Sequence, residues 1–598
     1  MAGQGWATHG KPRPPMRRRV LIAVGVIALL VVLAGLLLAF DAMKARGALL
    51  DAEDQALELR QQVTAGNVDA SRSALAGLKD STREAEASTD GPLWAAAARI
   101  PFVGQNFAAV QTVSRELRTI AGSGLQPLVD IADQVNADAF SPQNGRIDVD
   151  AIRELSPRLQ RADDALSGGW REIREIDTEE LAGPLRGPVA ELQNKVDDAR
   201  STVHAGATAA RLIPDMLGGS DKRTYVLAFQ NNAEIRSTGG LPGAFAILTA
   251  RDGRISMGGQ GAASDFPFFR SLPVKPTKDE LRLYSRQLTG FWADTTFTPD
   301  FPRSAEIMRA MVRKERNRTT DGVISVDPIA LSYILEATGP VTLSDGKRLT
   351  SANTVKRLLH DVYREIPGDG VARDAYFADA ARRVFSAVVS GQGGSQALLR
   401  GLAKSVDENR ILIESTRGSE QGELAASRIG GALPTDEGPT PHLGIYYNDA
   451  TATKLEYYFR QKTDVRATEC TTDGAQSLTT TTVLRSVAPK SARKLPRSIL
   501  GPGTGEKRGS FRMVMAFYAP YGGVVTRLEV DGEEQPLNRV EHDGVNVVTV
   551  PVLLAPGQRL TVKASMFTGK DQRDDAVFAT TPGIQATPNN VIVPSACD

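Results

Sequence analysis

An uncharged apolar stretch near the N-terminus constrains this chain more than any other feature. It runs from Val20 to Phe40 and reads VLIAVGVIALLVVLAGLLLAF. An α-helix rises about 1.5 Å per residue, so about 20 residues cross a hydrocarbon core of about 30 Å. The stretch therefore predicts a transmembrane helix over residues 20–40.

Basic residues stand directly before this stretch: Lys11, Arg13, Arg17, Arg18 and Arg19. Basic residues that flank a membrane span are retained in the cytoplasm. We therefore expect residues 1–19 to form a cytoplasmic tail and the rest of the chain to be extracytoplasmic. This arrangement is a single-pass, type II anchor in the cell membrane.

A cleaved signal peptide is the alternative to an anchor. Its apolar region is shorter, about 7–15 residues, and it ends at a site with two small residues. Here the apolar run is longer, and Phe40-Asp41-Ala42-Met43 does not provide such a site. The pattern favours the uncleaved anchor.

The overall charge and the scarce residue types exclude some functions. The chain has 71 basic and 70 acidic residues among 598, a net charge of +1, so no global field favours nucleic acid. Five histidines and two cysteines are too few for a Cys-rich zinc site. An even cysteine count outside the cytoplasm predicts one disulfide, Cys470–Cys597. Two unpaired buried thiols are the alternative.

The extracytoplasmic part divides into three regions by its apolar pattern. Residues 45–213 repeat apolar positions every three or four residues, which predicts an all-α helical bundle. Examples are Leu49, Ala52, Ala56, Leu59 and Val63, then Leu185, Val189, Leu192 and Val196. We expect these stripes to form the core of the bundle; a groove for a partner is the alternative.

Residues 221–435 alternate strand-like and helix-like segments, which predicts an α/β layered domain. Strands are expected at 224–229, 245–250 and 323–326, with helices at 302–312, 350–364 and 373–390. Residues 440–598 contain short apolar runs separated by turn signals. They predict an all-β sandwich of immunoglobulin-like outline.

A polar cluster follows the first strand of the α/β region. The segment QNNAEIRSTGG joins two apolar strands and contains Gln230, Asn231, Asn232, Glu234, Arg236, Ser237, Thr238, Gly239 and Gly240. Ligands of α/β sheets bind beyond the carboxyl ends of strands. Two amides, a guanidinium and a Gly pair suit a phosphate or a sugar hydroxyl. A hydrogen-bonded hairpin loop with a solvated Arg236 is the alternative.

The same segment carries a resemblance to a known family. Together with TPDFPRSAEIM, residues 298–308, it resembles an uncharacterised family of actinobacterial envelopes, domain of unknown function 4012. The resemblance, with the anchor and the helical region, covers most of the chain.

The order of elements also resembles the LytR–CpsA–Psr family, which transfers cell-wall glycopolymers from a polyprenyl pyrophosphate to peptidoglycan. Arg236-Ser237-Thr238 stands near that family's Arg-Ser-Asp-Thr cluster. Residues 321–327 and 335–341 resemble its strand, helix and turn. Arg373-Asp374-Ala375-Tyr376-Phe377 resembles the start of the Arg-rich helix that lines the lipid-pyrophosphate site. The resemblance implies that Arg236 and Arg373 clamp a pyrophosphate.

The metal-binding half of that pattern is different here. Asn231, Asn232 and Thr238 stand where the family has carboxylates, and an uncharged amide binds Mg²⁺ more weakly than a carboxylate does. Asp265, Asp294 or Asp300 from other loops would have to replace them, with Asp265 and Asp300 as the candidate catalytic residues. Mg²⁺ is the one cofactor implied, and no ligand set for it is defined.

Two functions remain open. The first is an envelope protein that binds, and as a phosphotransferase would transfer, a polyprenyl-phosphate-linked glycopolymer for wall or exopolysaccharide assembly. The second is a non-catalytic scaffold that holds partner proteins of an envelope assembly or export complex. The polymer, its acceptor and the oligomeric state are not encoded in any motif.

Overall fold

The computed structural model describes residues 16–65, 67–134, 142, 145–503, 505–586 and 589–597. It divides into two compact units. Unit 1 is drawn from Met1–Asn136 and Glu154–Ala210, and unit 2 from Ala137–Arg153 and Arg211–Asp598. Most of the predicted cytoplasmic tail, residues 1–15, lies outside the described residues.

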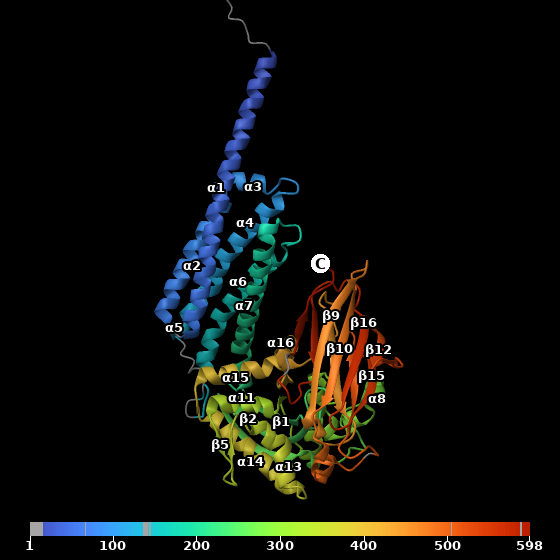
Figure 1. Cartoon of the computed structure of the whole chain (residues 1–598). Coiled ribbons are helices and arrows are strands. Elements are labelled where there is room, and N and C mark those ends of the chain that lie inside the picture. The colour runs from blue at the N-terminus through green and yellow to red at the C-terminus, as the bar shows by residue number, and fades with distance from the viewer. Residues whose placement is uncertain are drawn as a thin grey trace, which may run out of the picture. The chain divides into compact units, whose positions relative to one another are not determined.

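Unit 1 begins with one long helix, α1, from Met16 to Ala65. The predicted span and the first helix of the predicted bundle are therefore one continuous helix (Figure 1). Among the described residues, this is the one helix long and apolar enough to cross a membrane. The large apolar side chains between Leu29 and Phe40 are mostly exposed, for example Val31 at 65% and Leu36 at 63%.

The rest of unit 1 is helical. The elements are α2 (Val68–Thr89), α3 (Pro92–Ala97), α4 (Gly104–Thr119), η1 (Ile120–Leu125), α5 (Gln126–Gln134), and most of α6 (Val149–Arg174) and α7 (Gly183–Met216). Apolar residues at the predicted spacing are buried in small clusters between the helices. One contains Ala52, Leu59 and Leu75, and another Ile120, Leu166 and Val196.

Unit 2 contains a five-stranded sheet with the order β3-β2-β1-β4-β7. Its strands are β1 (Arg223–Asn231), β2 (Leu241–Arg251), β3 (Arg254–Ala262), β4 (Gly322–Val326) and β7 (Ile411–Ser415). The pair β1–β4 is parallel, whereas β1–β2, β2–β3 and β4–β7 are antiparallel. The sheet is therefore mixed. Because β1 and β4 are parallel, their carboxyl ends lie at the same end of the sheet.

Helices cover both faces of this sheet, because successive side chains of a strand point to opposite faces. Tyr225 and Leu227 pack into one apolar cluster with α11 (Pro328–Thr338) and α14 (Gly370–Val389). Val226 and Ala228 pack into a second cluster with α10 (Phe301–Arg316). Further helices of this half include α8 (Lys278–Tyr284), α9 (Gln287–Gly290), α12 (Thr354–Lys356), η5 (Arg357–Asp361), α13 (Val362–Glu365), α15 (Ser395–Asp407) and α16 (Gly418–Ala425).

The turn between β2 and β3 follows directly from the sequence. Asp252 and Gly253 have φ angles of 51° and 74°. A two-residue hairpin turn with positive φ at both positions matches the twist of the flanking strands, and Asp-Gly is a favoured pair for it.

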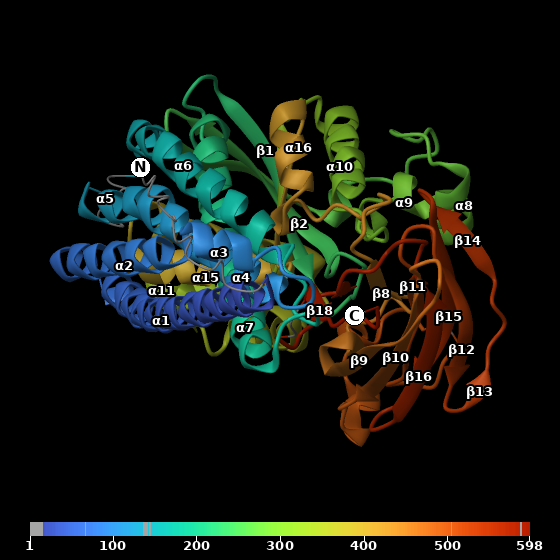
Figure 2. The ribbon, with the colours of Figure 1, turned by 90° about the horizontal axis from the view of Figure 1, so that it is seen from above.

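Two further sheets form from residue 442 onward. One has the order β13-β12-β16-β10-β9 and the other β14-β15-β11-β8-β17-β18. Figure 2 shows them as neighbouring layers. Their strands are β8 (His442–Asp449), β9 (Phe459–Cys470), β10 (Gln476–Ser486), β11 (Phe511–Tyr518), β12 (Val524–Val530), β13 (Glu533–Glu534), β14 (Arg539–His542), β15 (Val545–Leu554), β16 (Arg559–Phe567), β17 (Ala576–Thr580) and β18 (Val591–Val593).

One apolar core connects the two halves of unit 2. The cluster that fills the space within the C-terminal sheets also includes Ile235, Val362 and Tyr363 from the N-terminal half. Residues 211–597 thus fold as one body, in which the loop after β1 lies inside rather than at a free surface. The chain has the predicted apolar helix, helical region and several sheets.

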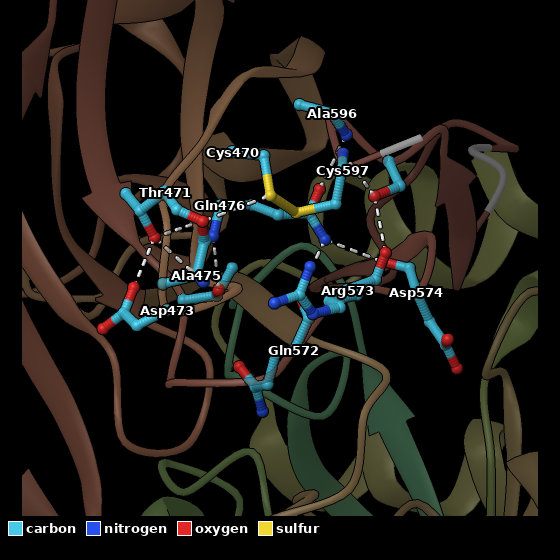
Figure 3. Close-up of a disulfide and its surroundings, with 12 residues drawn as sticks. Cys470, Thr471, Asp473, Ala475, Gln476, Gln572, Arg573, Asp574, Ala596 and Cys597 are labelled. Atoms are coloured by element: carbon cyan, nitrogen blue, oxygen red, sulfur yellow. Dashed lines mark hydrogen bonds between the residues drawn. A yellow bond between two sulfur atoms is a disulfide. The ribbon is translucent and has the colours of Figure 1, made fainter.

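A disulfide closes the end of the chain (Figure 3). Cys470, at the end of β9, is bonded to Cys597. Gln476 supports the same segment, because its side chain accepts a hydrogen bond from the backbone N–H of Ala596 and donates to the carbonyl groups of Gln572 and Asp574. The last residues are therefore held to β9 and β10 by a covalent bond and by buried hydrogen bonds.

Candidate functional site

A cavity of about 290 Å³ lies at the carboxyl ends of β1 and β4. Phe229 and Asn231 of β1 and Val326 of β4 contribute to its wall, together with the first residues of α11 and one face of α14. Open α/β sheets bind ligands at this edge. The volume is near the lower end of the range for small-molecule sites, about 300–1,000 Å³.

Most of the wall is apolar. α14 contributes Arg373, Phe377, Ala380 and Ala381, which follow the helical spacing and therefore share one face. Leu331 of α11 and the pair Leu358 and Leu359 of η5 contribute from other sides. The large apolar side chains of the wall are Phe229, Leu241, Val326, Leu331, Leu358, Leu359 and Phe377. Such a surface suits a hydrocarbon chain.

The charged end of the cavity is built around a buried tyrosine. Tyr363 accepts a hydrogen bond from the amide of Asn231 at 2.9 Å. The ammonium of Lys454 lies 4.8 Å from its ring centroid and the guanidinium of Arg373 at 5.7 Å. Lys454 is neutralised, because its Nζ lies 3.0 Å from a carboxylate oxygen of Glu234.

Arg373 has a different status from Lys454. It lies in the first turn of α14, which Asp369 caps by accepting a hydrogen bond from the N–H of Ala372. Its Nη1 donates to the carbonyl of Ile366 at 2.6 Å. Within the described part of the chain, no carboxylate forms an ion pair with its guanidinium. Arg373 therefore presents a cation at the cavity wall with donors left for an anion.

Asp374 lies beside this cation and also lines the cavity. Burial raises its pKa, although Arg373 partly opposes that shift. A half-buried carboxylate next to a guanidinium can accept hydrogen bonds from hydroxyl groups. The cavity thus combines an apolar wall, a cation that forms no direct ion pair among the described residues, and acceptors for hydroxyls.

Arg236, the first predicted ligand-binding residue, is not part of this cavity. Its guanidinium is 6% exposed and lies 3.0 Å from Asp294 and 3.6 Å from Asp449. It also stacks over the ring of Phe297 at 4.7 Å. Burial raises the pKa of nearby Glu456, and Asp449 raises it further. Arg236 is thus neutralised inside unit 2 and is not solvated.

The other polar residues of the loop are divided between the cavity and the interior. Asn231 and Glu234 line the cavity and are linked by a 3.0 Å hydrogen bond. Asn232 donates to Asp327 and to the carbonyl of Pro582, which places it inside unit 2.

Gln230 organises the end of the loop. Its side chain accepts from the N–H of Gly240 at 2.6 Å and donates to Thr238 at 3.3 Å. A Cβ at Gly240 would lie 2.3 Å from the backbone of Asn231, and Gly239 has φ of 134°. Both glycines are therefore needed by the backbone. Of the predicted ligand residues the structure brings Asn231, Glu234 and Arg373 to the cavity, and Gln230 of the same loop also lines it.

The candidate catalytic carboxylates both support local structure. Asp300 caps α10 by accepting from the N–H of Arg303 and also accepts from the N–H of Leu433. Asp265 accepts from the N–H of Ala262 and pairs with Arg316 at 2.6 Å. Neither lines the cavity. Across the described residues, no group of three or more His, Cys, Asp or Glu is arranged to hold a metal ion.

Asp374, Tyr363 and Lys454 are among the cavity residues that were not predicted from the sequence. Asp374 directly follows Arg373 in the segment 373–377, so the predicted ligand-binding role of Arg373 could have pointed to it. Tyr363 lies in a segment predicted only as a helix. Lys454 follows in a different half of unit 2, and no local pattern marks it, because only the tertiary fold brings it to Tyr363.

Comparisons with known proteins agree with one part of the sequence analysis. Residues 220–363 match a family described as "Protein of unknown function (DUF4012)". The match contains both segments that carried the resemblance to domain of unknown function 4012, and it contributes β1, β4 and α11 to the cavity. The chain has no match among curated proteins and none among solved structures.

Proposed function

We propose that this chain is a membrane-anchored, extracytoplasmic envelope protein that binds a polyprenyl-phosphate-linked glycopolymer in the cavity of unit 2. One observation carries the proposal: an apolar cavity has Arg373 in its wall, with no carboxylate partner among the described residues. An amphiphile with an anionic phosphate satisfies both features.

Each part of such a ligand has a matching group in the wall. Arg373 would bind the phosphate through charge-assisted hydrogen bonds. The apolar side chains of α14, α11 and η5 would contact the first isoprene units, because the volume is too small for a whole polyprenyl chain. Asp374 would accept hydrogen bonds from sugar hydroxyls, whereas the amide of Asn231 already donates to Glu234 and Tyr363.

The apolar part of α1 supports the anchor in this proposal. Its aliphatic side chains from Leu29 to Phe40 are largely exposed among the described residues, and a bilayer would cover them. The basic residues before it favour the type II orientation. A disulfide is typical of an oxidising compartment, in agreement with an extracytoplasmic unit 2.

The finer assignments belong to the same proposal. A LytR–CpsA–Psr-like arrangement of the α/β half, an immunoglobulin-like outline of the C-terminal sheets and an actinobacterial envelope origin remain parts of it. The proposed activity is binding. A transfer step has no residue assigned to it, because Asp265 and Asp300 are engaged in local structure outside the cavity.

The test is a binding measurement with three ligands on the full-length protein in nanodiscs: a short prenyl phosphate, the prenyl alcohol of the same length, and inorganic phosphate. Arg373→Gln should weaken prenyl phosphate binding about 10- to 150-fold, the equivalent of a lost charged hydrogen bond of about 1.5–3 kcal/mol. Arg382→Gln is the matched control, because Arg382 lies on the same helix, is exposed and does not line the cavity.

The outcomes separate the two candidate functions. Tight binding of prenyl phosphate, weak binding of the alcohol and sensitivity to Arg373 support the glycolipid site. The absence of any binding to wild type would reject it and favour the non-catalytic scaffold. The engagement of the predicted catalytic carboxylates in capping and ion pairs is the observation that supports the scaffold.

A further inference from the structure

The turn between α3 and α4 in unit 1 exposes a compact apolar tip. Ile100 and Val103 are each 50% exposed and Phe102 is 90% exposed; Pro101 lies between them. We define residues 100–103 as the apolar tip. Exposed apolar side chains scattered singly are common, but four adjacent ones on a tight turn mark an interaction surface.

The tip has a defined conformation. The N–H of Gly104 donates to the carbonyl of Ile100 at 2.8 Å, and a Cβ at Gly104 would lie 2.3 Å from the carbonyl oxygen of Ala98. Phe102 has φ of 66°, which is rare for a bulky residue and requires support from the surrounding structure. The aromatic side chain is therefore held outward by the backbone.

Two contacts fix the register of α2 against α1. Gln55 of α1 lies against Gly77 of α2, and Lys44 of α1 lies 4.0 Å from Glu84 of α2. The helices are thus antiparallel. From Glu84, α2 continues five residues to Thr89, a rise of about 7.5 Å.

This register places the start of α3 level with the end of the apolar stretch. Moving five residues from Lys44 in the opposite direction on α1 reaches Ala39 and Phe40, the last residues of the uncharged run. Figures 1 and 2 show α3 beside α1, and α1 continues alone beyond it (Figure 1). The tip follows α3, so it lies at the level where the apolar stretch ends.

α3 and α4 are firmly connected at this level. The indole of Trp94 donates to the carbonyl of Phe107 at 2.9 Å and packs edge-on against its ring at 5.1 Å. A polar turn lies next to α4, because the side chain of Asn106 accepts from the N–H of Ala182. That neighbouring turn carries the exposed residues Asp177, Glu179 and Glu180. Transfer of their charged carboxylates from water into a hydrocarbon environment would be strongly unfavourable.

We propose that the apolar tip inserts into the extracytoplasmic interface of the cell membrane. It would be a second contact with the bilayer, in addition to α1. The membrane is the occupant that the structure favours, because the tip continues the apolar surface of α1 at the same level. Amphipathic and aromatic side chains are typical of this interface. The acidic turn near Asn106 limits insertion to the four residues of the tip. Two contacts would fix the orientation of unit 1 on the bilayer.

The experiment uses full-length protein in vesicles with single introduced cysteines, because both native cysteines are in the disulfide. A fluorescent probe is attached in turn to Phe102→Cys, Leu33→Cys and Leu57→Cys. Leu33 lies in the apolar stretch. Leu57 is an exposed apolar residue of α1 that lies well beyond Phe40, where the apolar stretch ends. The probes are challenged with nitroxide-labelled lipids and with aqueous iodide.

The inference rests on the anchor proposed above, and the three positions separate the two. We expect nitroxide lipids to quench the probes at Leu33 and Phe102, with shallow nitroxides more effective than deep ones at Phe102, and iodide alone to quench at Leu57. Quenching by lipid at Leu33 with iodide quenching at Phe102 would overturn the tip and leave the anchor. No lipid quenching at Leu33 would reject both. Protection of Phe102 from both quenchers would mean that protein covers the tip, which also overturns the proposal.

Discussion

Removal of Arg236 should destabilise unit 2 without a direct effect on the cavity. The guanidinium is buried between Asp294 and Asp449, and Arg236→Ala would leave two carboxylates inside the protein with no cation. Removal of one partner from a buried ion pair costs about 3–5 kcal/mol, because the remaining charge is unpaired in a poor solvent.

A comparison with Arg373 makes this prediction specific. Arg373 is half-buried, and within the described part of the chain its guanidinium donates to the backbone carbonyl of Ile366. Arg373→Ala should therefore lower stability by less than about 1 kcal/mol, the range of a partly exposed side chain. The two arginines, which the sequence grouped as one clamp, should separate into one structural residue and one ligand-binding residue.

Hydrogen exchange of the full-length protein, followed in peptides of β1, measures the effect within unit 2. A loss of 3–5 kcal/mol corresponds to exchange faster by about two to four orders of magnitude for the slowest amides. The increase should shrink at low pH, because the orphaned carboxylates then become protonated. Arg236→Met combined with Asp294→Asn and Asp449→Asn should recover most of the stability.

The result that would refute this reasoning is a small effect. If Arg236→Ala changed β1 exchange by less than tenfold, the buried ion pairs would contribute little. If the same variant also lost prenyl phosphate binding while unit 2 stayed protected, Arg236 would be a ligand-binding residue after all.

Three further predictions concern stability. Burial raises the pKa of Asp300 to about 6, so the folded wild type binds an extra proton between about pH 4 and 6 and loses stability as pH rises through that window. The free energy of unfolding of Asp300→Asn relative to wild type should rise by about 2.5 kcal/mol from pH 4 to 7 in denaturant unfolding, whereas a constant difference would contradict this. In Gly240→Ala the new Cβ would lie 2.3 Å from backbone atoms, so this variant should lose about 1–3 kcal/mol of stability, measured by hydrogen exchange of β1. In Gly243→Ala the nearest atom is 3.7 Å away, so the loss should be much smaller, and equal losses would contradict the clash. Replacement of Cys470 and Cys597 by Ser removes a link across 127 residues and should cost about 5 kcal/mol in the chain-entropy model; an unchanged calorimetric midpoint would argue against it.

The elements that follow from local pattern were predictable. The uncharged stretch, the apolar buried strand around Tyr225 and the Asp252-Gly253 turn each depend on residues close in sequence, so their signals are complete within a short window. α1 is longer than predicted, because nothing between Phe40 and Leu49 breaks a helix.

The fate of the polar loop after β1 was not predictable in the same way. Its composition suits a solvated ligand loop, but its partners come from the far end of the chain. Asn448 accepts from the N–H of Ser237, and Thr581 donates to the carbonyl of Ser237. Asp449 completes the ion pairs of Arg236. A buried polar loop and an exposed one have the same sequence signature until these tertiary partners are known.

The cavity shows the same division. The face of α14 that carries Arg373 and Phe377 could be found from helical spacing, whereas Lys454 is brought to Tyr363 only by the packing of the C-terminal sheets. Local sequence therefore identified the cation, and the tertiary fold determined which of its polar neighbours are already paired.

The most direct test of the central claim is photo-crosslinking with a short prenyl phosphate that carries a diazirine on its first isoprene units. We predict that the label attaches to peptides of unit 2 that contain Leu331, Leu358 or Phe377. Unlabelled prenyl phosphate should compete, the matching alcohol should compete poorly, and Arg373→Gln should reduce the labelling. Labelling that falls outside these three peptides, or that is unaffected by Arg373→Gln, would contradict the account.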